Sequence, residues 1–150
     1  MPGTFSQILL HIVFSTKQRA AMIKPVIQPR LYDYLGGIVR EEKGTVYAIG
    51  GMADHVHLLV RWRTDRTVAD LLRTMKGRSS LWVHKTFPAF NDFAWQEGYA
   101  AFSVSKSAEP DVKTYIANQI EHHAHRGFEE ELLALLRAHE IDFEPRYVFD

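Results

Sequence analysis

The chain has 150 residues, a formal net charge of zero at pH 7 and no cysteine. This length suits one core of useful size, so we expect residues 1–150 to form a single domain. The charge balance argues against binding of nucleic acid by bulk positive charge, although it allows a local basic patch. The absence of cysteine excludes disulfides, thiolate nucleophiles and cysteine-based zinc sites.

The N-terminal residues lack the basic and apolar regions of a signal peptide. No apolar run reaches about 18 residues, the length that a membrane-spanning helix requires. We therefore expect a soluble, cytoplasmic protein without a membrane partner.

The periodicity of apolar residues predicts strands and helices in a regular order. The expected elements are a strand at 7–14, a helix at 25–42, strands at 45–49 and 55–62 joined through Gly50-Gly51, a helix at 68–85, a strand at 100–105, and helices at 110–123 and 128–139. Thr67 is the expected N-cap of the helix that follows it, and Pro29 favours a later start of the first helix. The tail from 141 to 150 is rich in aromatic residues, and we expect it to dock on this subunit or on another.

This order predicts an α+β, ferredoxin-like (split βαβ) fold. In such a fold, helices pack on an antiparallel sheet, and here a C-terminal helix is appended. The architecture hosts many unrelated activities, so function must be argued from particular residues.

The segment His55-Val56-His57 places two histidines on one face of a strand, because successive side chains of a strand alternate between faces. Two imidazoles at this spacing can bind one metal ion or one phosphate. His11, in the first strand, can look onto the same sheet face. It can also be a core histidine that is satisfied by one hydrogen bond, and the sequence leaves both interpretations open.

Tyr115 and Gln119 lie four residues apart on the third predicted helix and so share one face of it. Taken alone, such a pair is typical of a helix surface. Combined with the two histidines, the glutamine oxygen completes a three-ligand site for a divalent cation, and the tyrosine is placed to act as a nucleophile.

A second possible metal site is formed by His122 and His125 with His123 between them, although histidines also suit a helix C-terminus electrostatically.

His55-Val56-His57 resembles the His-hydrophobe-His motif of HUH nucleases, and Tyr115-x-x-x-Gln119 resembles the motif of their single-tyrosine transposases. The resemblance extends to the transposases of the smallest insertion sequences and to REP-associated tyrosine transposases, and it covers nearly the whole chain. Its further motifs are Lys17-x-Arg19, Gly51-x-x-x-His55 with Leu58-Leu59, Lys76-Gly77 and Trp95-x-x-Gly98-Tyr99.

The resemblance implies transposition through single-stranded DNA with hairpin ends, by a homodimer whose active sites can be shared between subunits. It implies that His55, His57 and Gln119 bind Mg²⁺ or Mn²⁺ and that Tyr115 attacks the scissile phosphate. Cleavage would leave a 5′-phosphotyrosine and a free 3′-OH.

DNA affinity must then come from local positive groups, because the total charge is neutral. The candidate nucleic-acid-binding residues are Lys17, Arg19, Lys76, Arg78, Arg61 and Arg63. The alternative function is that of a domesticated, non-catalytic module of the same fold that binds single-stranded nucleic acid.

Overall fold

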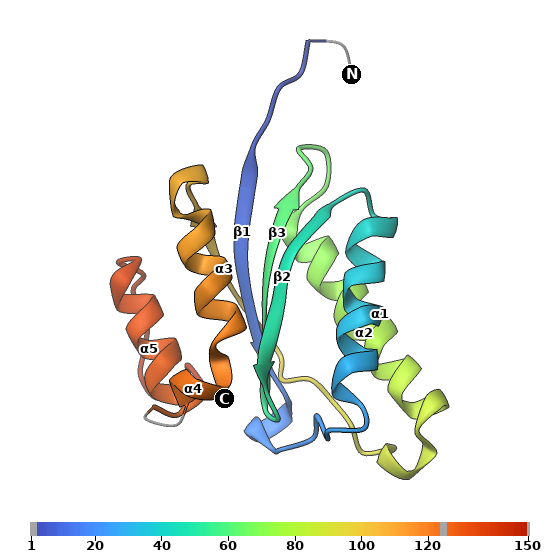
Figure 1. The fold of residues 1–150 in the computed structure, drawn as a ribbon. Coiled ribbons are helices and arrows are strands. Elements are labelled where there is room, and N and C mark those ends of the chain that lie inside the picture. The colour runs from blue at the N-terminus through green and yellow to red at the C-terminus, as the bar shows by residue number, and fades with distance from the viewer. Residues whose placement is uncertain (1–2, 124–125, 150) are drawn as a thin grey trace.

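The computed structural model describes residues 3–123 and 126–149 and contains a four-stranded antiparallel sheet (Figure 1). The strands are β1 (Ile8–Ser15), β2 (Thr45–Met52), β3 (His55–Trp62) and β4 (Ala100–Val104), and their order across the sheet is β2-β3-β1-β4. All three strand pairs are antiparallel. The α+β, ferredoxin-like prediction is confirmed.

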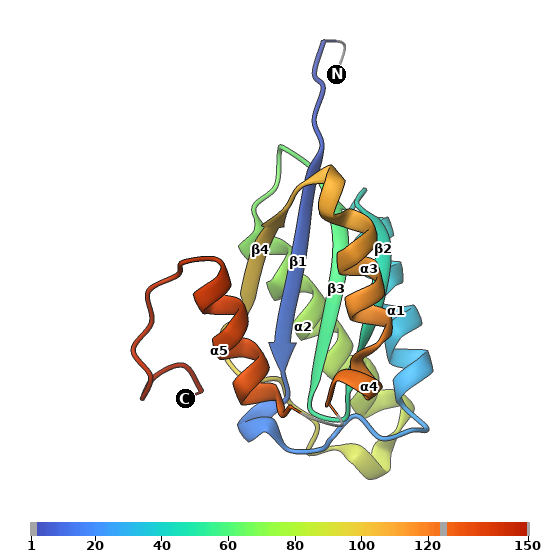
Figure 2. The same ribbon diagram turned by 60° about the vertical axis from the view of Figure 1, so that its left-hand side comes forward.

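Helices cover both faces of the sheet (Figure 2). On one face lie α1 (Gln28–Glu41) and α2 (Val68–Thr86). On the other lie α3 (Glu109–Ala117), α4 (Gln119–His123) and α5 (Phe128–Ala138). Short 3₁₀ helices form at Lys17–Arg19, Pro88–Phe90 and Lys106–Ala108. None of the helices in the described ranges is long and apolar enough to cross a membrane.

The two faces of β3 serve different purposes. Val56, Leu58 and Val60 belong to the main hydrophobic core, which packs between the sheet and α1 and α2. The opposite face carries His55 and His57, which are fully buried because α3, α4 and α5 cover it. Alternation along one strand therefore separates the core from a buried polar site.

A second, smaller core fixes α5 and the tail. It is built from Val13, Phe102, Phe128 and Leu136, and the tail residues Phe143, Val148 and Phe149 pack against it. The described part of the tail therefore docks on its own chain.

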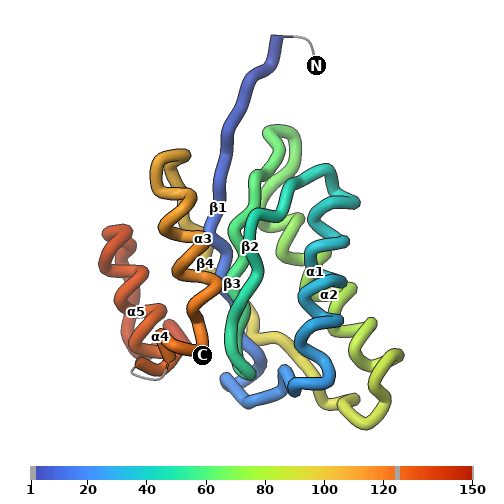
Figure 3. The backbone as a smooth tube through the Cα atoms, viewed as in Figure 1, coloured from blue at the N-terminus to red at the C-terminus, as the bar shows by residue number. Residues whose placement is uncertain are grey.

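The helix predicted at 110–123 is interrupted. Asn118 leaves the helical region (φ −99°, ψ 26°) and separates α3 from α4, so the chain changes direction between them, as the backbone tube shows (Figure 3). The short helix α4 thereby brings Gln119 into the interior, where it is 2% exposed.

The predictions for the starts of the first two helices are confirmed. Thr67 caps α2, where it accepts a hydrogen bond from the Asp70 amide (3.0 Å). Pro29 lies in the first turn of α1, which begins at Gln28.

Gly50 is the point at which α3 rests on the sheet. Gly50 and Gly51 lie within β2 rather than in the turn, which is formed by Ala53 and Asp54. A Cβ atom at Gly50 would lie 2.3 Å from the carbonyl oxygen of Ile116, so only glycine allows α3 to approach this closely.

Candidate active site

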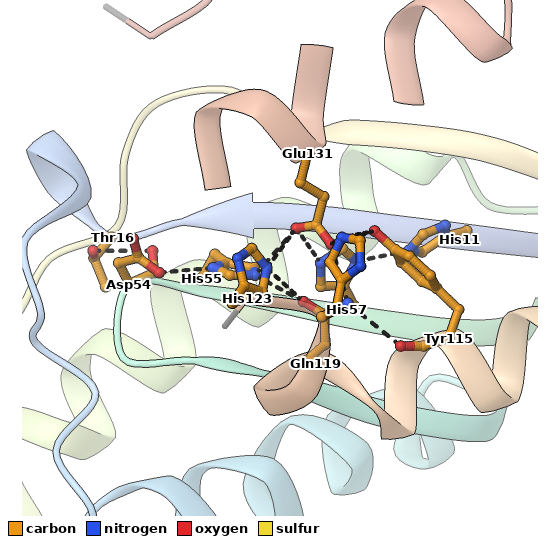
Figure 4. Close-up of polar contacts among 10 residues, drawn as sticks. His11, Thr16, Asp54, His55, His57, Tyr115, Gln119, His123 and Glu131 are labelled. Carbon is orange, nitrogen blue, oxygen red and sulfur yellow. Dashed lines mark hydrogen bonds and ion pairs between the residues drawn. The ribbon is translucent and has the colours of Figure 1, made fainter. Parts of the chain in front are cut away.

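His55 stands at the start of β3, and both of its ring nitrogens are engaged (Figure 4). Its Nδ1 donates to Asp54 Oδ1 (2.7 Å), and its Nε2 lies 3.1 Å from Gln119 Oε1 and 3.3 Å from Glu131 Oε1. Burial alone would lower the pKa of His55, but the hydrogen bonds to Asp54, Glu131 and Gln119 outweigh it and raise the pKa to about 9.

His57 connects His11 to Glu131. Its Nδ1 lies 2.8 Å from His11 Nε2, and its Nε2 lies 3.0 Å from Glu131 Oε1. Burial lowers the pKa of His57 despite the nearby carboxylate. Burial and the neighbouring His57 also lower the pKa of His11 to about 3, so His11 is neutral and holds the ring of His57 in place.

Glu131, on α5, is the central acceptor of the site and was absent from the sequence-based candidates. It is 1% exposed, and its carboxylate contacts His55, His57 and Tyr115. Burial would raise the pKa of Glu131, but hydrogen bonds from the two histidines hold it far below its usual range. One signal for it exists in the sequence. Glu131 lies three residues after Phe128 and four before Leu135, so it interrupts the apolar stripe of its helix.

Tyr115 and Gln119 both face this carboxylate. The Tyr115 hydroxyl donates to Glu131 Oε2, and the Gln119 amide nitrogen donates to the same oxygen (3.1 Å). The Tyr115 ring centroid lies 5.8 Å from that of His57. Burial, followed by the hydrogen bond to Glu131 and then by the charge of Glu131, raises the pKa of the Tyr115 phenol. All four predicted catalytic and metal-binding residues therefore lie together in one chain.

His123 joins the same cluster. Its Nε2 lies 3.0 Å from both Gln119 Oε1 and Glu131 Oε1. His122 instead lies beside Tyr115, with its Nε2 3.4 Å from the phenol oxygen. The alternative metal site also required His125, which lies outside the described residues.

The donor set suits a divalent ion. Donor atoms of His55, His57, His123 and Glu131 all lie within 4.8 Å of one another. Imidazole nitrogen and carboxylate oxygen together are typical ligands of divalent transition-metal ions, which include Mn²⁺. His55 and His57 each turn Nε2 toward the cluster while Nδ1 contacts a supporting side chain, which is the usual arrangement around metal-binding histidines.

The predicted basic residues do not form one surface. Lys17 is exposed just beyond the end of β1, and Ser15 of that strand pairs with His55. Arg19 is held by the C-terminal part of the chain: its Nε lies 2.8 Å from Glu129 Oε1, and its Nη1 donates to the Phe149 carbonyl (2.9 Å).

The other four basic residues lie elsewhere and contact protein groups. The Lys76 ammonium donates to the carbonyls of Gln96 (2.8 Å) and Gly98, and partial burial lowers the pKa of Lys76 to about 8. The remaining contacts are Arg78 with Glu41 (3.0 Å), Arg61 with the Ser6 carbonyl (3.1 Å) and Arg63 with the Glu42 carbonyl (3.1 Å). Arg61 and Arg63 line a hollow of about 510 Å³ at the end of β3 away from the histidines.

A ferredoxin-like sheet that carries a buried His-Val-His strand opposite a tyrosine helix agrees with the resemblance to HUH single-tyrosine transposases. The family model described as "Transposase IS200 like" matches residues 4–119. The chain belongs to this family of IS200-like transposases, as the sequence resemblance predicted.

Individual relatives agree with this assignment. The ISDra2 transposase TnpA of Deinococcus radiodurans is 24% identical over 122 residues, which cover 78% of this chain and 87% of the relative. A crystal structure described as a transposase from Deinococcus radiodurans R1 has a TM-score of 0.64 and 24% identity, over 79% of this chain and 95% of that chain. The structure of a REP-associated tyrosine transposase bound to a REP hairpin has a TM-score of 0.60 and 12% identity, over 82% and 73% of the two chains. These structures share the fold.

Proposed function

We propose that this transposase cleaves and rejoins single-stranded DNA at hairpin-bearing element ends through a covalent tyrosine–DNA intermediate. In this proposal Tyr115 is the nucleophile, and His55, His57 and Gln119 hold Mg²⁺ or Mn²⁺. One observation carries the proposal: the carboxylate that accepts the Tyr115 hydroxyl also contacts the histidine pair. Family membership and the hairpin bound to the REP-associated relative support it.

Cleavage starts with attack of Tyr115 Oη on the phosphorus of the scissile phosphate. The Oη–P bond forms and the P–O3′ bond breaks, and the 3′ oxygen leaves with the bonding electrons and takes up a proton. The strand downstream of the cut stays attached to Tyr115 through its 5′-phosphate, as a 5′-phosphotyrosine, and the upstream strand ends in a free 3′-OH. Rejoining is the reverse reaction with the 3′-OH of another strand, and it needs no ATP because a phenolate leaves far more readily than an alkoxide.

The proton of Tyr115 has a nearby acceptor. Glu131 Oε2 accepts the phenol hydrogen bond, whereas His122 Nε2 lies 3.4 Å away. Burial and the Glu131 charge raise the pKa of Tyr115, so the phenol stays protonated before DNA binds. A bound divalent ion would supply positive charge to stabilise the charge that develops on the phosphate oxygens.

We infer that one chain forms a complete active site instead of sharing it with a second subunit. The contacts that support this inference, from Glu131 to Tyr115 and to His57, all lie within one chain. A mixture of Tyr115→Phe and His57→Ala proteins should therefore stay inactive, and recovery of cleavage would contradict the inference. Dimerisation, which the resemblance implies, is a separate question that light scattering answers.

Lys17 is the candidate that best fits a contact to the DNA backbone. Its side chain is exposed, and Ser15, two residues before it, pairs with His55 at the end of the sheet where the site lies. A single lysine at this place would add a salt-dependent contribution to affinity, which suits a protein of zero net charge.

The test uses labelled, hairpin-bearing single-stranded DNA from the flanks of the protein's own gene, with Mn²⁺ or Mg²⁺, resolved on a denaturing gel. Wild-type protein should give a covalent protein–DNA band that is absent with Tyr115→Phe. His57→Ala should lose cleavage and keep hairpin binding. Hairpin binding by wild type without any adduct would instead favour the non-catalytic binding module.

A further inference from the structure

We propose that His123 of α4 and Glu131 of α5 are direct ligands of the divalent ion, alongside His55 and His57. The C-terminal helix would then supply the only carboxylate among the metal ligands of the site. This inference deepens the proposed function, on which it rests for the presence of a metal. It replaces Gln119 of the predicted three-ligand set with His123 and Glu131, which lie outside both the His-Val-His motif and the Tyr-x-x-x-Gln motif.

The spacing of the donor atoms carries the argument. Glu131 Oε1 lies 3.0 Å from His57 Nε2, 3.0 Å from His123 Nε2 and 3.3 Å from His55 Nε2. For a metal–ligand distance of about 2.1 Å, neighbouring donors are about 3.0 Å apart in an octahedral site and about 3.4 Å apart in a tetrahedral site. Each of the three imidazole nitrogens therefore lies at a distance from the carboxylate oxygen that two ligands of one ion would have, and all four donors lie within 4.8 Å of one another.

The side chains that hold His55 and His57 also favour a metal site. Asp54 holds Nδ1 of His55, and His11 holds Nδ1 of His57, so Nε2 of each ring is directed at Glu131 Oε1. Outer partners of this kind fix the ring orientation of metal-binding histidines. One histidine would be enough to form a purely structural ion pair with the Glu131 carboxylate. Three imidazoles converge on it instead, which favours a metal site.

Gln119 is close to the same donors and takes a supporting part. Its Oε1 lies 3.0 Å from His123 Nε2, and its Nε2 donates to Glu131 Oε2 (3.1 Å). The two oxygens of Glu131 then have separate partners. Oε1 faces the histidines, and Oε2 faces Tyr115 and Gln119. One carboxylate thus links the proposed metal site to the nucleophile.

Binding of Mn²⁺ to the full-length, EDTA-treated protein without DNA tests the ligand set. The hydrated ion gives an electron paramagnetic resonance signal that is lost on binding, so a titration yields the affinity. Loss of a supporting partner weakens metal binding by about 10–100-fold, so loss of a direct ligand in Glu131→Gln should weaken it by at least about 100-fold. Glu130→Gln, an exposed neighbour on α5, is the matched control and should stay within about twofold of wild type.

Thermal unfolding gives a second readout, because an ion that binds only the folded state raises Tm. Mn²⁺ should raise the Tm of wild type and of Glu130→Gln, and the shift should be lost in Glu131→Gln. Should Glu131→Gln fail to fold, as circular dichroism would show, His123→Gln decides the question, and we expect a loss of affinity of at least about 100-fold there, beyond what loss of a supporting partner causes.

Three results would overturn the ligand assignment: a wild type that does not bind Mn²⁺, a folded Glu131→Gln that binds it as tightly as wild type, or a His123→Gln of unchanged affinity. These outcomes are separable from failure of the proposed function. Adduct formation by Tyr115 with no effect of Glu131→Gln on Mn²⁺ affinity overturns the ligand assignment alone. Glu131-dependent Mn²⁺ binding without any adduct overturns the proposed function alone.

Discussion

Replacement of Gly50 by alanine tests how far the site depends on the seating of α3 against the sheet. A Cβ atom there would lie 2.3 Å from the Ile116 carbonyl oxygen and 3.1 Å from Ile116 Cγ2. Close carbon–oxygen contacts in proteins are about 3.3–3.6 Å, so α3 must move away from β2 by roughly 1 Å to admit the methyl group.

From the size of this shift we expect two effects, a lower free energy of unfolding and slower formation of the covalent adduct. Overpacking of this kind costs about 1–3 kcal/mol in the free energy of unfolding, which leaves a domain of ordinary stability folded. Tyr115 directly precedes Ile116, so the same shift moves the nucleophile relative to His57. A misplacement of about 1 Å can slow a reaction about 100-fold, and we expect Gly50→Ala to form the covalent adduct about 100-fold more slowly.

Urea unfolding and time courses on denaturing gels measure the two effects separately. Gly37→Ala in α1 is the matched control, because nothing lies within 4 Å of a Cβ atom at that position. We expect the control to react at the wild-type rate and to gain up to about 1 kcal/mol, since alanine favours a helix over glycine. A folded Gly50→Ala protein that reacts as fast as wild type would refute the reasoning.

Three further predictions concern charged groups. In metal-free protein the folded-state pKa of His55 is about 9, above its ordinary 6.5, so its stabilising contribution is complete below pH 6.5 and is lost as the pH rises through 9. Urea unfolding in EDTA across this range should show the decline in wild type, and an equal decline in His55→Gln would contradict the assignment. Lys76→Met should lower the free energy of unfolding by about 1.5 kcal/mol and leave DNA affinity nearly unchanged, because the ammonium is held by two carbonyls. Lys17→Ala should leave the free energy of unfolding nearly unchanged and weaken DNA binding in salt-dependent binding assays. Weakened DNA binding by folded Lys76→Met would show that the charge of Lys76 reaches the DNA. Arg19→Ala removes a contact to Glu129 and one to the tail, so limited proteolysis should cut residues 141–149 faster than in wild type, and unchanged cleavage would show that the aromatic packing alone holds the tail.

The sheet and the histidine strand could be predicted because they depend on local pattern. Alternation along β3 assigns Val56 and Leu58 to the core and the two histidines to the other face, whatever packs there. The order of strands and helices then restricts the topology to few choices. The spacing of Tyr115 and Gln119 likewise needs only the geometry of a helix turn.

The remainder of the site depends on tertiary packing, which a single sequence does not display. Neither glycine nor proline marks the break at Asn118, and the break allows Gln119 to reach His55. Glu131 is one of three consecutive glutamates at the start of α5, and only the docking of that helix determines which one is buried. Ion pairs such as that of Arg19 with Glu129 cannot be predicted either, because the sequence does not distinguish a basic residue that faces DNA from one that contacts another part of the chain.

Mass spectrometry of the covalent adduct tests the central claim most directly. After reaction with hairpin-bearing single-stranded DNA and Mn²⁺, nuclease and protease digestion should leave a nucleotide attached through its 5′-phosphate to the peptide that contains Tyr115. The account predicts that this residue alone carries the nucleotide. A nucleotide attached to any other side chain, or attached through its 3′-phosphate, would contradict it.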